Sequence, residues 1–211
     1  MSRSPLKHGM ALLLFFSLVP ALACASALAQ FKAFVASTQS AKGEFTQHRV
    51  IKVEEETRTA RPSSGTFVFS RPGKFVWTYQ KPYYQIIQAD GVKLYLYDKD
   101  LNQVTIKKLG TALGSNPAAI LFGSADIDKH FTLKEAGTKD GLEWLEVIPK
   151  SDTSFEKIKI GLQQGMLASM ELHDSFGQVS ILSFKRIEKN PAIKPGFFKF
   201  VIPKGADVMS R

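Results

Sequence analysis

The sequence is poor in cysteine and in metal-ligand or nucleotide motifs, and these absences exclude several classes of protein. Cys24 is the only cysteine among 211 residues, so neither an intrachain disulfide nor a cysteine-rich zinc site can form. No histidine has a second histidine at the H-x-x-x-H spacing of a helical metal motif, and neither a P-loop nor a dinucleotide fingerprint is present. An enzymatic function therefore has no motif to support it.

Two short segments resemble functional motifs without completing them. Segment 98–102 begins like a calcium-binding loop, but Gln103 stands where a turn glycine is needed and Leu109 where a bidentate Glu is needed. Segment 173–175 places His, Asp and Ser in a row, without the glycine pattern of a nucleophile elbow. We expect a polar turn at the first segment, and no catalytic triad or metal site from either.

The charge is mixed rather than extreme, and it is spread along the chain. There are 28 Lys and Arg against 19 Asp and Glu, giving a net charge of +9, and 44% of the residues are hydrophobic. This balance is typical of a globular domain with a substantial core. The densest basic spots, 107–108 and 185–186, are too short to indicate a nucleic-acid binder. A positive chain suits an anionic lipid surface or an acidic partner better.

The N-terminus has the three parts of a secretory signal peptide. Arg3 and Lys7 precede an apolar run over 10–23, which is shorter than the roughly 20 residues of a spanning helix. Small residues follow, with cleavage sites after Ala25 and after Ala29. We predict cleavage after Ala25 and an exported mature chain.

The expected mature chain is one domain over residues 26–211, preceded by a signal peptide over 1–25. Cys24 leaves an alternative open, because a bacterial lipoprotein keeps such a cysteine as its lipidated first residue. Three positions earlier, Ala21 stands where leucine is usual. We therefore favour a chain without a lipid anchor, and keep lipidation of Cys24 as the alternative.

The sequence predicts a helix over 26–39. After it, apolar residues recur at every second position, which is the spacing typical of strands. Asp90-Gly91 predicts a tight hairpin, and a second short helix is expected over 116–122. Many short strands in succession predict an antiparallel sheet that curls into a barrel or a sandwich. The expected strands are 44–51, 65–71, 74–80, 85–90, 92–98, 103–107, 131–135, 142–148, 155–162, 166–173 and 179–187, with an extended tail over 198–203.

One face of the predicted sheet is densely apolar. Since side chains alternate between faces, that face carries Phe67, Phe69, Phe75, Trp77, Tyr79, Leu94 and Leu96. Such a face can form a packed core or line a ligand cavity; the pattern does not separate the two, and taken alone it favours a packed core. Arg71 lies in register with it, and a guanidinium that points inward needs carbonyl or carboxylate partners. Otherwise the following turn carries Arg71 into solvent.

The order of the motifs resembles one known family. In sequence they are Gly43-Glu44-Phe45-Thr46-Gln47, Gly65-Thr66-Phe67, Arg71-Pro72-Gly73-Lys74-Phe75-Val76-Trp77, Ala89-Asp90-Gly91 and Phe198-x-Phe200-x-x-Pro203-x-Gly205. Over essentially the whole mature chain, this order resembles the LolA family of periplasmic lipoprotein carriers. The resemblance implies a mainly β fold, an incomplete antiparallel β-barrel of about ten to eleven strands closed by a helical lid.

The resemblance also implies a function without covalent chemistry or a cofactor. Such a carrier is a periplasmic monomer that shields the acyl chains of lipoproteins and does not bind nucleic acid. It receives them from an inner-membrane ABC transporter and delivers them to an outer-membrane receptor of the LolB type. Three alternatives stay open: a lipidated LolB-like receptor, an exported binder of another amphiphile, and an exported hydrolase.

The resemblance assigns two groups of residues. Arg71 looks like the family arginine that closes the lid through backbone carbonyls, here expected near Val35, Leu121 and Phe122. Phe75 looks like the aromatic residue whose position governs transfer, so we expect Phe75→Glu to impair cargo handling more than stability. The residues expected to bind acyl chains are Phe45, Phe67, Phe69, Phe75, Trp77, Leu94, Leu96 and Ile120.

Overall fold

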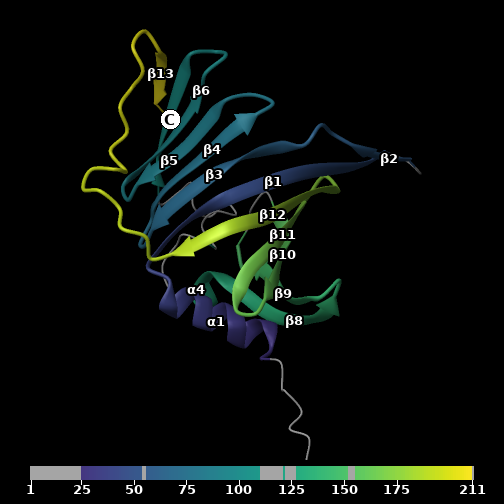
Figure 1. Cartoon of the computed structure of the whole chain (residues 1–211). Helices are drawn as coiled ribbons and strands as arrows, with labels where there is room; N and C mark the ends of the chain where they lie inside the picture. The colour runs from purple at the N-terminus through teal and green to yellow at the C-terminus, as the bar shows by residue number, and fades with distance from the viewer. Residues whose placement is uncertain (1–24, 54–55, 110–120, 122–126, 152–154, 211) are drawn as a thin grey trace, which may run out of the picture.

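The computed structural model describes residues 25–53, 56–109, 121, 127–151 and 155–210, and they form one curved sheet with a helix across its inner face (Figure 1). The helices that lie wholly within the described residues are α1 (Ala27–Ser37) and α4 (Ile127–His130). The strands are β1 (Ser40–Val53), β2 (Glu56–Thr59), β3 (Ser63–Ser70), β4 (Lys74–Lys81), β5 (Gln85–Asp90), β6 (Lys93–Asp98), β7 (Gln103–Lys108), β8 (Phe131–Lys139), β9 (Leu142–Pro149), β10 (Phe155–Gln163), β11 (Met166–Asp174), β12 (Gln178–Lys189) and β13 (Asp207–Ser210).

The sheet has thirteen strands in the order β13-β7-β6-β5-β4-β3-β1-β12-β11-β10-β9-β8, with β2 paired to β1 beside this path. All neighbouring strands are antiparallel except β13 and β7, which are parallel. The two ends of the path, β13 and β8, leave the barrel open. The predicted mainly β fold, an incomplete antiparallel barrel, is thus confirmed, and β2 and β13 extend it beyond the expected strand number.

The C-terminal tail differs from its prediction. Residues 198–203 form turns and irregular backbone, and the last strand is β13 instead. The tail packs on the side of the sheet opposite the apolar face, where the ring of Phe200 stacks on Tyr95 with 4.6 Å between centroids. Gln88 Nε2 donates to the carbonyl of Phe198 at 2.9 Å. In the tail, Phe198 and Phe200 therefore contact β5 and β6 and do not belong to a strand.

The predicted helix over 26–39 is α1, and its N-terminus is held from another strand. Ser26 is the N-cap, and its Oγ accepts from Ala29 N–H at 3.3 Å. The carboxylate of Glu135 on β8 accepts from Ala27 N–H at 3.2 Å and from Leu28 N–H at 2.9 Å. Glu135 thus satisfies two helix N–H groups that have no partner within the helix.

The body and C-terminus of α1 are also attached to the sheet. The buried Gln30 accepts from Gly165 N–H in the β10–β11 turn at 2.8 Å. After β12, Asn190 Nδ2 donates to the Ser37 carbonyl at 2.9 Å, and Asn190 Oδ1 accepts from Gln39 N–H at 2.8 Å. The helix is therefore tied at both ends and lies against β8 to β11. The second predicted helix, over 116–122, lies outside the described residues except for Leu121.

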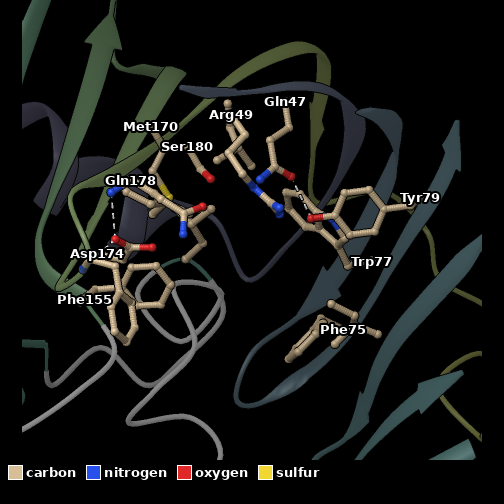
Figure 2. Close-up of a pocket in the computed structure, with 15 residues that line it drawn as sticks. Gln47, Arg49, Phe75, Trp77, Tyr79, Phe155, Met170, Asp174, Gln178 and Ser180 are labelled. Atoms are coloured by element: carbon tan, nitrogen blue, oxygen red, sulfur yellow. Dashed lines mark hydrogen bonds between the residues drawn. The ribbon is translucent and has the colours of Figure 1, made fainter. Parts of the chain in front are cut away.

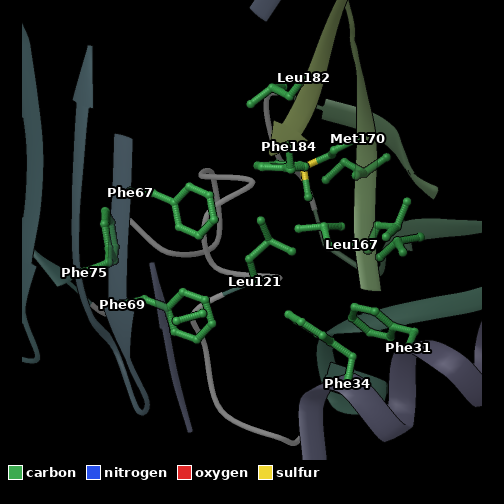
Figure 3. Packing of buried hydrophobic residues seen from close by; sticks show 14 of the residues in the cluster. Phe31, Phe34, Phe67, Phe69, Phe75, Leu121, Leu167, Met170, Leu182 and Phe184 are labelled. Carbon is green, nitrogen blue, oxygen red and sulfur yellow. The ribbon is translucent and has the colours of Figure 1, made fainter. Parts of the chain in front are cut away.

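The apolar core lies between α1 and the inner face of the sheet (Figure 3). Phe31 and Phe34 on α1 are almost fully buried. The side chains that are buried on the sheet itself come from β1 and from β3 to β6 on one side and from β9 to β12 on the other. Figure 3 shows Leu121 between these two sides. The predicted apolar face therefore points inward.

Candidate functional site

A cavity of about 510 Å³ lies on the inner face of the curved sheet. One wall comes from β4, with Phe75, Trp77 and Tyr79, and Met170 of β11 and Ser180 of β12 lie across from it (Figure 2). Leu172 of β11 and Leu182 of β12 line the cavity on these same two strands. Ile87 of β5, Leu121 and Phe155 of β10 also border it. Strands at a distance in the sequence therefore supply its two walls.

The β4 wall is built from interlocking aromatic rings. Trp77 packs on Phe45 with 4.1 Å between ring centroids and on Phe67 with 5.7 Å. Tyr79 meets the edge of Phe45 at 5.1 Å, and its hydroxyl donates to Gln47 Oε1 at 2.8 Å. Burial raises the pKa of Tyr79, so its hydroxyl stays neutral at physiological pH. Each aromatic pair contributes stabilisation beyond that of the apolar area it buries. These contacts therefore make the wall comparatively rigid.

The rim of the cavity is polar. Arg49 and Gln47 lie on the β4 side, and Asp174 and Gln178 lie on the opposite side (Figure 2). Asp174 Oδ1 accepts from Gln178 N–H at 2.8 Å and so holds the β11–β12 turn. At the tip of that turn, 84% of the surface of Phe176 is exposed. The cavity thus combines an apolar interior with a charged mouth, which is the arrangement that a ligand with an apolar chain and a polar end requires.

Arg71 follows β3 directly and bridges two backbone segments. Its Nη2 donates to the carbonyl of Leu121 at 2.6 Å, and its Nη1 donates to the carbonyl of Val35 in α1 at 3.5 Å. The second bond is at the outer limit of hydrogen bonding and is the weaker of the two. The guanidinium also lies over the ring of Phe69, 5.2 Å from its centroid. Arg71 therefore points inward, and its role in lid closure stays a prediction.

Burial of Arg71 is costly for the charged guanidinium. It lowers the pKa of Arg71 to about 10, so the group is still charged at neutral pH but less favourably hydrated than in the unfolded chain. Carbonyl oxygens and an aromatic face offset part of this cost. An arginine in such a place is better suited to hold two segments together than to raise the stability of the fold.

The residues predicted to bind acyl chains separate into three groups. Phe75 and Trp77 line the cavity, whereas Phe45, Phe67 and Phe69 are buried in the core cluster and do not line it. Leu94 is buried and Leu96 half-buried in the same cluster. Ile120, like the predicted Arg71 partner Phe122, lies outside the described residues.

The burial of Phe75 changes one expectation. Its side chain is fully buried, so Phe75→Glu would place a carboxylate among apolar side chains, where the charged form is unfavourable. We now expect this substitution to damage the fold as well as cargo handling. Phe75→Leu is the better test of its contact with a ligand.

Sequence reasoning missed the facing wall of the cavity. Met170, Leu172 and Leu182 were placed on predicted strands but given no role in a site. For Met170 and Leu172, the alternation with Ser169, Glu171 and His173 was the available signal. The pattern could not indicate that β11 and β12 curve round to face β4.

The incomplete motifs take part in ordinary structure. Asp98 Oδ1 accepts from the backbone N–H of Asp100 and Leu101 in the β6–β7 turn. His173 Nε2 lies 3.1 Å from Glu171 Oε2 on the same strand. Within the described part of the chain, no group of three or more His, Cys, Asp or Glu side chains is placed to hold a metal ion.

No helix among the described residues has both the length and the apolar character that a membrane crossing needs.

Comparisons with known proteins identify the family. The model of the family described as "Outer membrane lipoprotein carrier protein LolA" matches residues 36–201. A protein of Cupriavidus pinatubonensis named "Outer-membrane lipoprotein carrier protein" is 56% identical over 190 residues, which cover 90% of each chain. A protein of Cupriavidus taiwanensis with the same name is 54% identical over 202 residues, covering 95% of each.

A solved structure agrees with this at the level of the fold. The crystal structure of an uncharacterized conserved protein from Thermus thermophilus matches with a TM-score of 0.53 at 13% identity, over 87% of this chain and 96% of that one. At that identity the likeness concerns the fold alone. The match to the family model over most of the chain, together with the two relatives, shows that this protein belongs to the LolA family of outer-membrane lipoprotein carrier proteins.

Proposed function

We propose that this protein is a carrier that shields the acyl chains of lipoproteins in its cavity and moves them through the periplasm. The observation that carries the proposal is the cavity of about 510 Å³, with apolar walls and a polar mouth, in a member of the LolA family. Each CH₂ group removed from water contributes about 0.8 kcal/mol. Acyl chains therefore need such a shield to cross an aqueous space.

The proposed route has two ends. An inner-membrane ABC transporter loads the carrier, and an outer-membrane receptor of the LolB type accepts the cargo. ATP hydrolysis by the transporter drives the loading, so the carrier needs no nucleotide site, cofactor or covalent chemistry. Delivery follows if the receptor binds the cargo more tightly than the carrier does. We propose that the carrier acts as a monomer.

Arg71 is the proposed latch of this cycle. Its hydrogen bonds to the carbonyls of Leu121 and Val35 join α1 to a second segment across the apolar interior. A hydrogen bond to a charged group is worth about 1.5–3 kcal/mol. Two of them, one at the distance limit, favour a closed carrier without preventing its opening.

The contacts at the start of α1 favour cleavage after Ala25 over cleavage after Ala29. Cleavage there keeps Ser26, the N-cap of α1, and the Ala27 and Leu28 N–H groups that donate to Glu135. Cleavage after Ala29 would remove all three. We propose a signal peptide over residues 1–25 and one mature domain over 26–211.

A release assay tests the carrier function. Inner-membrane vesicles that hold a labelled, outer-membrane-destined lipoprotein are incubated with the mature protein and ATP. We expect the label to appear in the supernatant in a complex with this protein. A parallel incubation without ATP is the control and should release no label.

The opposite outcome has a specific meaning. If an established LolA carrier releases the label and this protein does not, the carrier proposal fails for that cargo. Intact-mass analysis then tests the receptor alternative, because a lipid on Cys24 and a chain beginning at Ser26 differ in mass.

A further inference from the structure

A second pocket, which we call the basic pocket, opens beside the mouth of the acyl-chain cavity. It has a volume of about 520 Å³ and lies along β1, β3, β4 and the β4–β5 turn. Four side chains line both spaces, namely those of Gln47, Arg49, Tyr79 and Ile87. The basic pocket therefore adjoins the cavity, and one ligand can reach from one into the other.

All charged side chains that line the basic pocket are positive. They are Arg49, Arg61 and Lys81, and each of them is exposed. Among the side chains that the structure describes, none forms a salt bridge with these three. Asp174, across the cavity mouth, accepts hydrogen bonds from two backbone N–H groups of its own turn instead. An anionic ligand would therefore gain the attraction of the three cations without displacing any described carboxylate.

Arg49 joins the positive charge to the apolar interior. Figure 2 shows its guanidinium directed toward Trp77 and Tyr79 of the aromatic wall. Burial raises the pKa of Tyr79, and the positive charge of Arg49 opposes this effect, so the two groups are close enough to interact. An acyl chain that rests on Trp77 therefore has its head beside a guanidinium.

The size of the cavity suits a ligand with one chain. Its volume of about 510 Å³ lies within the range of about 300–1,000 Å³ that is usual for sites that bind one small molecule. This space is present while Arg71 donates to the Leu121 carbonyl. A ligand of this size therefore needs no break in that hydrogen bond.

We propose that the protein binds an amphiphile with one acyl chain and an anionic head, either a lysophospholipid or a fatty acid. The chain lies in the cavity along Trp77, and the phosphate or carboxylate lies in the basic pocket beside Arg49. The hydroxyls of Ser63 and Tyr83, which also line this pocket, can donate to the oxygens of the head. This ligand class goes beyond lipoproteins, and the inference rests on the cavity and its charges, not on the proposed carrier function.

The test compares three lipids that share a myristoyl chain and differ in the head. Lysophosphatidylglycerol and myristate are anionic, and monomyristoylglycerol is neutral. Their binding to the delipidated mature protein is measured by titration calorimetry below the critical micelle concentration. Because each exposed charge contributes little, we expect an anionic lipid to bind about five- to tenfold more tightly than the neutral lipid at low salt. The ratio should fall toward one at about 0.5 M salt, since salt screens exposed charges. The tighter of the two anionic lipids identifies the head as phosphate or carboxylate.

Two triple variants locate the effect. Arg49→Gln/Arg61→Gln/Lys81→Gln should bind the three lipids with similar affinity. The control variant Lys93→Gln/Lys134→Gln/Lys199→Gln loses the same net charge from exposed positions outside both pockets, and should keep the preference. If the control loses the preference too, or the first variant keeps it, the basic pocket does not bind the head and the proposal is overturned.

The remaining outcomes separate this proposal from the carrier function. Equal binding of the anionic and neutral lipids to the unaltered protein, or no binding of any of them, overturns the proposal. Glycerol phosphate has the head without the chain and should not bind measurably. If it bound as tightly as lysophosphatidylglycerol, the basic pocket would be a site for free phosphates and the amphiphile assignment would fall. The carrier function is tested by ATP-dependent release of a lipoprotein, so either proposal can fail while the other stands.

Discussion

Beneath α1, the inner face of the sheet is filled, and Leu145 and Leu162 have no exposed surface. Further along the same face, Trp77 and Leu172 border a cavity of about 510 Å³. Both regions use strands with the same alternation of apolar and polar side chains. The difference lies in what covers them, because α1 is tied across the first region by Glu135, Gln30 and Asn190.

This comparison shows that a sheet face forms a packed core where a helix covers it, and borders a cavity where no described helix does. A helix placed on the face supplies Phe31 and Phe34, which pack between the strands. At the cavity, none of the described helices places such side chains between the strands. The facing walls therefore stay apart and leave room for a ligand. Substitutions in the two regions should therefore have different effects on stability.

The largest loss of stability is expected in the packed region. Leu145→Ala should lower the free energy of unfolding by about 2–5 kcal/mol, because it leaves an empty space in a close-packed core. Leu172→Ala borders an existing cavity and should cost about 1–2 kcal/mol, mainly the apolar contact area that it loses. Urea unfolding of both variants gives the comparison. Equal losses would mean that the region around Leu172 is as tightly packed in solution as the core.

A smaller loss of stability is expected for Asn190, which follows β12 and holds the C-terminal end of α1 by hydrogen bonds. Asn190 has a positive φ of 52°, so Asn190→Gly removes its side-chain hydrogen bonds without straining the backbone. The loss should be about 1–2 kcal/mol, with faster amide hydrogen exchange in α1. Asn190→Asp keeps the oxygen that accepts from Gln39 N–H and is the matched control. If exchange in α1 were unchanged in Asn190→Gly, this tie would not hold the cover in place.

The tie at the other end of α1 should depend on pH. Desolvation acts to raise the pKa of Glu135, but hydrogen bonds from Leu28 N–H, the Ser26 hydroxyl and Ala27 N–H outweigh it and lower the pKa. A lowered carboxyl pKa stabilises the fold above the unfolded-state value near 4. This stabilisation is lost as the pH falls through the lowered value.

Hydrogen exchange of the Ala27 and Leu28 amides, corrected for the intrinsic pH dependence, measures this effect. Protection should fall as Glu135 is protonated, and by a small amount, because the carboxylate is mostly exposed. Glu135→Gln keeps one acceptor oxygen and should show protection that does not change with pH. A pH dependence that persists in Glu135→Gln would assign the titration to another group.

The smallest effect on stability, with a large effect on function, is expected for Arg71. Arg71→Leu removes a charge whose burial is unfavourable, so the free energy of unfolding should stay the same or rise. Transfer of cargo to the receptor should fall several-fold if the latch is needed. Arg71→Lys, which cannot form the two-armed contact of a guanidinium, should restore little of the transfer. Normal transfer by Arg71→Leu would remove Arg71 from the proposed latch.

Much of the local structure could be predicted from the sequence, because its signals are local. The alternation in β3 and β4 placed Phe67, Phe69, Phe75 and Trp77 on one face, and all four are buried. The helix α1 and the open antiparallel barrel were predicted as well. The strand at 207–210 was not, because its pairing with β7 depends on where the tail lies and not on its own pattern.

The site divides in the same way. Arg71 could be singled out because a charged residue in register with an apolar face is visible in the sequence. Its bond to Leu121 crosses 50 positions, and the bond of Leu28 to Glu135 crosses 107. The sequence by itself determined which side chains face inward, since alternation along a strand needs only the strand. Only the tertiary structure decided which of them surround a cavity, because curvature and the cover of α1 bring distant strands face to face.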